Sequence, residues 1–321
     1  MTAPTPEKRV LVTGGGGFVC RHIIEALLGA GYDVIALDRA FDVDLLEHWQ
    51  TYWGDRVEVL MGTVDKLPSI GVDAIVHGAA LTASAQEAGL SPENHLRANL
   101  DPTLEILEWA QTQNVRRTVC ISSSAVYSKT AGKVTEDAPP TPDNLYAIAK
   151  SATESLVQTL RRDYGRDVIT IRLSNVYGTG EISRESRPRV SLIGKLIREA
   201  LTTGRMHISH PDDLRDWTFT ADIGQAIVSL LDAPQLTYAL YNVASEQTVT
   251  TQQLAQHIQA LLPETELVIN SDATPNLARQ GYLSHDRLQS DTGFDSWTSL
   301  HDGLTQVIAW GREHVAQEGV R

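Results

Sequence analysis

The sequence predicts an α/β fold in which a doubly wound parallel sheet carries a smaller, interleaved C-terminal lobe. Three observations predict it. Short apolar runs alternate with stretches of helical periodicity up to about Leu173, glycines follow the first apolar run, and the alternation gives way to polar, irregular sequence after Gly178. Strand-helix-strand alternation implies parallel strands joined by right-handed crossovers, with helices on both faces of the sheet.

Six short apolar runs are the predicted strands of the first part. They are Arg9–Val12, Val34–Leu37, Val57–Met61, Ala74–Val76, Thr118–Ile121 and Val168–Arg172. Apolar residues at helical spacing predict helices between most of these strands. The predicted helices are Phe18–Leu28, which glycines end, Pro92–Thr112 and Asn144–Tyr164.

The second part has a different rhythm. Thr179–Pro188 is polar and aperiodic, which predicts a loop, and Asp212–Phe219 is expected to be a polar turn that enters a strand. Short helices are predicted over Val190–Thr203, Ile223–Leu231, Thr251–Leu262 and Leu300–Trp310. We therefore expect two interleaved parts, residues 1–178 and residues 179–321.

Composition excludes several classes of protein. The formal net charge of -13 over 321 residues disfavours a nucleic-acid partner, because an acidic surface repels phosphates. No apolar run approaches the ~20 residues of a membrane-spanning helix, and the polar start is unlike a signal peptide. The two cysteines, Cys20 and Cys120, form no pairing motif, so a reducing, cytoplasmic location is expected. The histidines lack metal-ligand spacing, and no metal is expected.

The first informative motif is the run Thr13–Cys20, which contains four consecutive glycines between a predicted strand and a predicted helix. Gly14 can adopt the backbone angles of a tight turn, and Gly17 has no side chain to block a pyrophosphate. The helix that follows directs free N–H groups and the positive end of its dipole at such a phosphate. The motif therefore predicts a dinucleotide-binding fold of the Rossmann type.

An acidic residue strengthens this interpretation. Asp38 ends the second predicted strand, about twenty residues beyond the glycines, where a carboxylate can accept hydrogen bonds from the ribose hydroxyls. A carboxylate there repels the 2′-phosphate of NADP, so NAD is the expected cofactor. Arg39 weakens that choice, because a guanidinium beside Asp38 could bind such a phosphate.

A group of hydroxyl and amine side chains predicts the chemistry. A predicted strand runs into the serine-rich segment Ser122–Tyr127, and Tyr146 and Lys150 lie four residues apart on one helix face. A phenol has a reference pKa near ~10, and a neighbouring ammonium favours the phenolate. Tyr146 could then remove a hydroxyl proton while the substrate carbon gives a hydride to the cofactor.

These motifs together resemble the extended short-chain dehydrogenase/reductase family, in the NAD-dependent epimerase/dehydratase group that includes UDP-galactose 4-epimerase. The resemblance extends from Arg9 to about Trp310. The motifs that carry it are Thr13–Val19, Asp38, residues 77–80 (His-Gly-Ala-Ala), Asn99, Ser122–Tyr127, Tyr146–Lys150, residues 172–178 (Arg-Leu-Ser-Asn-Val-Tyr-Gly) and residues 215–217 (Arg-Asp-Trp).

The resemblance implies a role for each matching position. The implied catalytic trio is Ser123, Tyr146 and Lys150. The implied cofactor-binding residues are Gly14, Gly16, Gly17, Phe18, Val19, Asp38, Arg39, Thr63, Val64, Gly78, Ala79, Ala80, Asn99, Tyr146, Lys150, Leu173, Asn175 and Val176. The candidate substrate-binding residues are Ser123, Ser124, Asn175, Arg189 and Arg215.

Two arginines, Arg189 and Arg215, are among the candidate substrate-binding residues. Arg215 matches the family's phosphate-gripping arginine, and Arg189 is chosen because it begins the next predicted helix. Either guanidinium suits a phosphate or a carboxylate. Arg184 and Arg187 are interpreted as parts of a solvated loop. The family also pairs the helices Pro92–Thr112 and Asn144–Tyr164 with those of a second subunit, which implies a homodimer.

The sequence departs from the family in several places. Cys20 stands where the family commonly has glycine, which puts close helix–strand packing there in doubt. Thr63 replaces an aspartate that contacts adenine, Ser128 replaces a usual glycine, and Thr179 replaces a usual proline. The Thr-Asp-Glu set of the dehydratases is replaced at residues 123–125 by Ser-Ser-Ala. Dehydration then has no obvious proton donor, and a dehydratase is ranked low.

Three functions remain open at this point. The first is an NAD-dependent epimerase or oxidoreductase acting on a hydroxyl of a sugar nucleotide or sugar derivative. The second is a net dehydrogenase of a sugar or sugar acid that releases NADH. The third is a cofactor-binding regulator without turnover, which is disfavoured because the serine, tyrosine and lysine are all present. Residues 1–178 would hold NAD and the catalytic trio, and residues 179–321 would mainly bind substrate.

Overall fold

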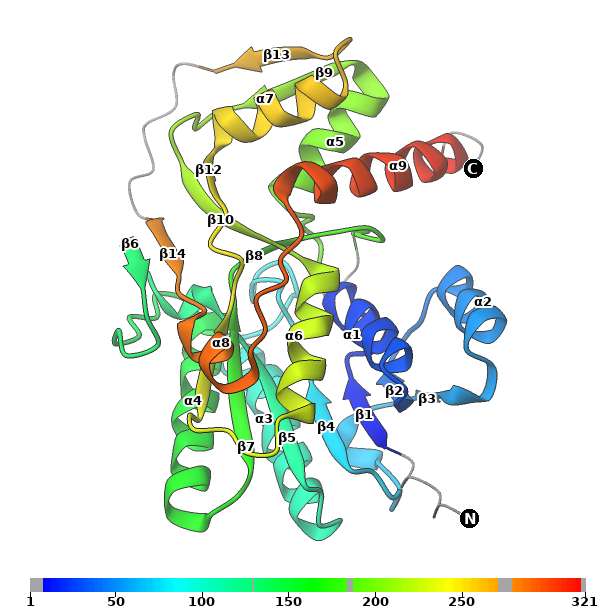
Figure 1. Cartoon of the computed structure of the whole chain (residues 1–321), viewed down its shortest axis with the longest axis vertical. Helices are drawn as coiled ribbons and strands as arrows, with labels where there is room; N and C mark the ends of the chain where they lie inside the picture. Colours follow the sequence, from blue (N-terminus) through cyan, green and yellow to red (C-terminus); the bar gives the residue numbers. More distant parts are fainter. Residues whose placement is uncertain (1–7, 129, 184–186, 271–278, 319–321) are drawn as a thin grey trace.

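A seven-stranded parallel sheet forms the centre of the structure, a computed structural model that describes residues 8–128, 130–183, 187–270 and 279–318 (Figure 1). The strand order is β11-β7-β5-β4-β1-β2-β3. The strands are β1 (Arg9–Thr13), β2 (Asp33–Asp38), β3 (Val57–Met61), β4 (Ala74–His77), β5 (Arg117–Ser123), β7 (Val168–Leu173) and β11 (Leu240–Val243). The six predicted strands are confirmed within two residues at each end, whereas β11 is not among the predicted strands.

Helices cover both faces of this sheet, which confirms the doubly wound fold. The first face carries α1 (Phe18–Gly29), α2 (Val43–Tyr52) and α6 (Thr220–Asp232), and the second carries α3 (Pro92–Thr112) and α4 (Leu145–Tyr164). Side chains alternate along β1 because successive residues of a strand point to opposite faces. Val10 and Val12 join the core beneath α1 and α6, and Leu11 joins the core beneath α3 and α4.

The large sheet and the helices that cover it come from both parts of the chain. Helix α6 packs along α1, and β11 pairs with β7 at the sheet edge, although both follow Gly178. Most predicted helices are found with shifts of up to three residues, and α6 begins at Thr220 rather than at Ile223. The helix predicted over Leu300–Trp310 is longer than predicted and runs to Glu318. The described residues of Thr179–Pro188, which exclude residues 184–186, contain no helix or named strand.

A second group of elements lies above the carboxyl edge of the sheet in Figure 1. Its helices are α5 (Leu192–Thr203), α7 (Thr251–Leu261) and α9 (Leu300–Glu318). They share an apolar core that includes Leu196, Ile258 and Leu304. The small sheets are β12-β10-β8 (Thr248–Thr250, Leu214–Phe219, Asn175–Tyr177), β13-β9 (Glu266–Ile269, Arg205–Ile208) and β14-β6 (Arg279–Leu283, Thr130–Val134). The remaining helix is α8 (Asp286–Thr292), and short 3-10 turns are η1 (Gly54–Arg56), η2 (Val64–Lys66) and η3 (Ser124–Val126).

The junction between the two groups positions the site. Strand β8 begins two residues after β7 ends and pairs with β10, so the chain passes directly from the large sheet into the upper group. The carboxyl ends of β1, β4, β5 and β7 therefore face this junction, which is the edge where open α/β sheets bind ligands. None of the helices in the described ranges is long and apolar enough to span a membrane.

Candidate functional site

The glycine turn after β1 is a close-packed backbone cradle. Gly14 has φ +74°, and a Cβ there would lie 2.8 Å from the backbone nitrogen of Ala79. The amide of Gly17 donates to the carbonyl of Gly14 at 2.8 Å, and Gly17 is the N-cap residue that precedes α1 and offers no side-chain cap. The first N–H groups of α1 therefore face outward with no capping oxygen, which is the arrangement that binds a phosphate.

Asp38 is fastened to this cradle at the end of β2. Its carboxylate accepts hydrogen bonds from the amide of Gly16 at 3.0 Å and from the amide of Arg39 at 2.7 Å. Arg39 is exposed. Thr63 immediately precedes the η2 turn, in which Val64 is buried. The carboxylate is therefore held next to the phosphate cradle, where a ribose would follow.

The cradle opens into a cavity of about 850 Å³ that most of the predicted residues share. The predicted residues that line it are Gly14, Gly17, Phe18, Val19, Gly78, Ala80, Ser123, Tyr146, Lys150, Leu173, Val176 and Arg189. They come from the turn between β1 and α1, from α1, β5, α4, β7 and β8, and from the segments that follow β4 and precede α5. We call this space the cofactor cavity.

The predicted catalytic trio meets on one wall of the cofactor cavity. A hydrogen bond joins the side chains of Ser123 and Tyr146. The Lys150 ammonium donates to the carbonyl of Ile121 at 2.8 Å and lies 5.6 Å from the centre of the Tyr146 ring. Helix α4 brings Tyr146 and Lys150 together because they are one turn apart, and Asn144 caps the helix by accepting from the amide of Ala147.

Burial dominates the ionisation of this pair. Burial raises the pKa of Tyr146 to about 12, while the hydrogen bond with Ser123 and the charge of Arg187 lower it. Burial lowers the pKa of Lys150 to about 8. The phenol is thus protonated at neutral pH and needs further positive charge before it can act as a base.

Two buried side chains behind the cavity fix its shape. The His77 ring is hydrogen-bonded to Thr13 at 2.8 Å and to Thr103 at 3.1 Å, and burial lowers its pKa to about 3. Asn99 accepts from the amide of Leu81 at 3.0 Å and donates to the Leu81 carbonyl at 3.2 Å. Both residues therefore hold the segment after β4, and Asn99 is not among the residues that line the cavity.

Cys20 packs closely, although the resemblance implies a glycine at this position. A Cβ on Gly78 would lie 2.3 Å from the Cys20 sulfur, so the thiol occupies space that Gly78 leaves free. Burial raises the pKa of the thiol to about 12, which makes it unreactive. The close approach of α1 to β4 is thus kept by pairing a larger residue with a smaller one.

The other predicted substrate residues lie in a second cavity of about 370 Å³, which we call the side cavity. Ser124, Asn175 and Arg215 line it, and Ser174 lines both cavities. The amide of Asn175 donates to the backbone carbonyl of Asp216 at 3.1 Å. The predicted substrate residues therefore divide between two adjoining spaces.

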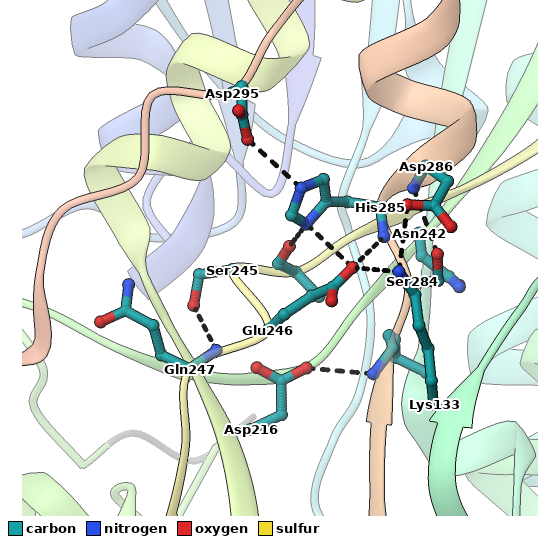
Figure 2. Close-up of polar contacts among 12 residues, drawn as sticks. Lys133, Asp216, Asn242, Ser245, Glu246, Gln247, Ser284, His285, Asp286 and Asp295 are labelled. Carbon is teal, nitrogen blue, oxygen red and sulfur yellow. Dashed lines mark hydrogen bonds and ion pairs between the residues drawn. The ribbon is translucent and has the colours of Figure 1, made fainter.

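A polar cluster adjoins the side cavity at Asp216, which lines the cavity and takes part in the contacts of Figure 2. The carboxylate of Asp216 accepts from the amide of Leu283 at 3.1 Å, and burial raises the pKa of Asp216 to about 7. Lys133 bridges Glu246 at 3.2 Å and Asp286 at 3.1 Å. These contacts fasten β14 to β10, and they fasten β6 to α8 and to the connection between β11 and β12.

The structure places one arginine differently from the sequence prediction. Arg187 lines the cofactor cavity with its guanidinium 4.7 Å from the centre of the Phe18 ring, and it pairs with the buried Glu181. The expectation of a solvated Arg187 is therefore wrong. Arg189 is largely exposed and pairs with Glu87 at 2.8 Å across the cavity mouth. A charged loop sequence gave no signal that Glu181 would be buried and draw Arg187 inward.

In the described ranges, no group of three or more histidine, cysteine, aspartate or glutamate side chains is arranged to hold a metal ion.

The glycine cradle, the Asp38 carboxylate bound to it and the cofactor cavity fit a dinucleotide. Fold and site together define an NAD-dependent enzyme of the Rossmann type.

Comparison with known proteins narrows the class. The NAD dependent epimerase/dehydratase family matches residues 10–244, and the chain belongs to this family. It is 28% identical to dTDP-4-dehydro-6-deoxy-D-allose reductase of a Streptomyces species over 96% of this chain and 97% of the relative. It is 24% identical to Protein CapI of Staphylococcus aureus over 95% of this chain and 99% of the relative.

Solved structures agree with the fold. The structure of MoeE5 with UDP-glucuronic acid and NAD has a TM-score of 0.79 at 25% identity, covering 95% of this chain and 99% of that one. UDP-glucose 4-epimerase of Thermotoga maritima has a TM-score of 0.82 at 21% identity, covering 96% and 99%. The predicted fold, family, NAD dependence and enzymatic nature are confirmed at the level of the family.

Proposed function

We propose that this enzyme oxidises a hydroxyl of a sugar nucleotide or a related sugar derivative with NAD, and that it acts as an epimerase. The observation that carries the proposal is the shared wall of the cofactor cavity. Ser123, Tyr146 and Lys150 line the same space as the glycine cradle of α1. A substrate hydroxyl beside Tyr146 would therefore lie next to a dinucleotide whose pyrophosphate binds at Gly14 and Gly17.

The chain's own residues would divide the proton chemistry among them. Ser123 would hold the substrate oxygen through its hydroxyl, and Tyr146 would accept the hydroxyl proton. The Lys150 charge on the face of the Tyr146 ring would favour the phenolate. NAD would supply the hydride acceptor and further positive charge. The substrate carbon would lose a hydride, its oxygen would lose a proton, and a ketone would result.

The side cavity supports an extended substrate. It adjoins the cofactor cavity at Ser174 and is lined by Asn175 and Arg215. A guanidinium at that position suits the phosphate of a sugar nucleotide or the carboxylate of a sugar acid. We propose that the sugar lies beside Ser123 and Tyr146 and that Arg215 contacts the anionic part of the substrate, with Arg187 and Arg189 on the opposite side.

The alternative function is a net dehydrogenase, which would use the same residues and release NADH. The two functions differ in one respect only: an epimerase returns the hydride to the other face of the ketone. The available space does not separate them, because the cofactor cavity and side cavity accept either a sugar nucleotide or a smaller sugar acid. Matches to proteins named as UDP-glucose epimerases support the epimerase, and a match to a protein named as a reductase keeps the net oxidoreductase as the alternative.

The experiment that separates the functions follows absorbance at the NADH band across UDP-, dTDP- and GDP-sugars and free sugar acids, with product analysis by NMR. Interconversion of stereoisomers without net NADH supports the epimerase. Stoichiometric NADH supports the dehydrogenase. Tight NAD binding with no change in any substrate would favour a cofactor-binding regulator and contradict the proposal.

The proposal also covers the roles of the two parts of the chain, the oligomeric state, the cellular location and the partners. Residues 1–178 would carry NAD and the catalytic trio, and residues 179–321 would mainly supply substrate contacts. The enzyme would be a homodimer paired through α3 and α4, a pairing supported by the exposed side chains of Leu104 and Ile148. It would be cytoplasmic, as supported by two buried, unpaired cysteines. No nucleic acid or membrane is expected as a partner.

A further inference from the structure

A buried ion pair lies directly behind the catalytic wall. Glu154 of α4 and Arg172 of β7 form two hydrogen bonds, Nε to Oε1 at 2.9 Å and one terminal nitrogen to Oε2 at 2.6 Å. Each residue is 2% exposed. A charge pair so fully removed from water is costly unless its geometry is good and its remaining bonding positions are filled.

The remaining hydrogen-bonding positions of the ion pair are filled by Ser122 and Tyr127, the residues on either side of the segment Ser123–Val126. The hydroxyl of Ser122 donates to Glu154 Oε1 at 2.6 Å, and Arg172 donates to the hydroxyl oxygen of Tyr127. The guanidinium also lies 4.8 Å from the centre of the Tyr127 ring. One ion pair thus holds the chain immediately before Ser123 and again four residues after it.

The same pair also holds the helix of the catalytic tyrosine and lysine. Tyr146, Lys150 and Glu154 are spaced four residues apart on α4 and so share one face. Lys150 bonds the carbonyl of Ile121, which precedes Ser122, and Glu154 bonds the side chain of Ser122. Helix α4 is therefore anchored to the end of β5 at two successive turns.

We infer that Glu154 and Arg172 are positioning residues that set the distance between Ser123 on β5 and Tyr146 and Lys150 on α4. The inference rests on the proposed function, since it concerns the same catalytic trio. A small loss of alignment between a hydroxyl, a phenol and a substrate carbon lowers the rate of the chemical step far more than it lowers binding.

Charge gives Glu154 a second effect that packing alone would not have. The Lys150 ammonium lies over the Tyr146 ring, and the groups that interact with it electrostatically are Glu154 on α4, Cys120 on β5, Cys20 on α1 and His77 on β4. Burial raises the pKa of both thiols to about 12 and lowers the pKa of His77 to about 3, so these three groups are neutral at pH 7. Glu154 is then the anion among them that keeps Lys150 protonated, against the burial that lowers the Lys150 pKa.

The test uses two mild substitutions that leave the ion pair intact. Ser122→Ala removes one bond to Glu154, Tyr127→Phe removes one bond to Arg172, and the double variant removes both. We expect the double variant to lose at least tenfold in kcat, with KM and the Kd for NAD changed less than threefold. Glu154→Gln should also move the alkaline limb of the kcat–pH profile to lower pH by at least half a unit.

Asp167→Asn is the matched control. Asp167 bonds Arg117 at 2.8 Å and Arg161 of α4 at 2.9 Å, near the other end of the helix and away from the cavity. It should lower the melting temperature while leaving kcat unchanged. Wild-type kcat in the double variant, or an equal loss of kcat in Asp167→Asn, would overturn the inference.

Tyr146→Phe is measured in parallel so that two failures remain distinguishable. If Tyr146→Phe is inactive while the double variant keeps full activity, only the positioning role is wrong. If Tyr146→Phe is fully active, the proposed function itself is wrong. If Glu154→Gln fails to fold, the decision rests on the double variant, which retains both charges.

Discussion

Replacement of Gly78 by alanine should destabilise the protein through one contact. The new Cβ would lie 2.3 Å from the Cys20 sulfur and 3.1 Å from Cδ1 of Ile121. The first distance is far inside van der Waals contact, and both partners are buried. Overpacking of this kind costs about 1–3 kcal/mol, so we expect the free energy of unfolding to fall by about 2 kcal/mol.

A double-mutant cycle tests the cause of that loss. Cys20→Ala removes the sulfur and should by itself cost about 1 kcal/mol through lost burial. In the Cys20→Ala background, Gly78→Ala should cost less than about 1 kcal/mol, because only the contact with Ile121 remains tight, and the coupling free energy should be about 1–2 kcal/mol. The assay is urea unfolding of the four proteins, followed by tryptophan fluorescence and by circular dichroism. Strictly additive losses would refute the explanation, because they would show that sulfur and methyl group do not compete for one space.

Three further predictions concern the cofactor, the substrate and acid stability. Asp38→Ala should weaken NAD binding by about 10- to 100-fold, because hydrogen bonds to a charged group are worth about 1.5–3 kcal/mol. The same variant should discriminate less between NAD and NADP. An unchanged ratio of the Kd values for NAD and NADP would contradict the assignment of Asp38 to the ribose. Arg215→Ala should raise the KM of an anionic sugar substrate at least about tenfold and leave the Kd for NAD within threefold, and equal losses in both would contradict the assignment of the side cavity to substrate. Burial lowers the pKa of His77 in the folded protein to about 3, so as the pH falls below about 6.5 the His77 imidazole is protonated in the unfolded chain before it is protonated in the folded protein. The free energy of unfolding should therefore drop by about 2–3 kcal/mol by pH 4.5. His77→Gln should reduce this dependence of stability on pH, as measured by urea unfolding at several pH values.

The parts of the fold that follow local rules were predictable from the sequence. The glycines after β1, the cap at Asn144 and the apolar runs of the sheet each depend on a few neighbouring residues. Strand β11 did not follow such a rule. Its four residues become a strand because they pair with β7, which lies some seventy residues earlier in the chain.

The candidate site likewise combines features that local sequence patterns predict with features that depend on contacts between distant residues. The spacing of Tyr146 and Lys150 predicts their shared helix face, and the resemblance adds Ser123 to them. The inward turn of Arg187 depends on the burial of Glu181, which no local pattern indicates. The compensation between Cys20 and Gly78 is likewise a contact between a helix and a distant strand end. The division of the substrate residues between two cavities depends on the packing of β14 against β10, which the sequence does not reveal.

The central claim is that the phenol of Tyr146 is the base beside an NAD molecule held at α1. The most direct measurement compares turnover and NAD binding in the wild-type protein and in Tyr146→Phe, with substrate saturating and pH fixed at 7.5. General acid–base catalysis is worth about 10²- to 10⁴-fold, so we predict a loss of that size in kcat together with a Kd for NAD within threefold of the wild type. Undiminished turnover in Tyr146→Phe, or the absence of any NAD affinity in the wild-type protein, would contradict the account.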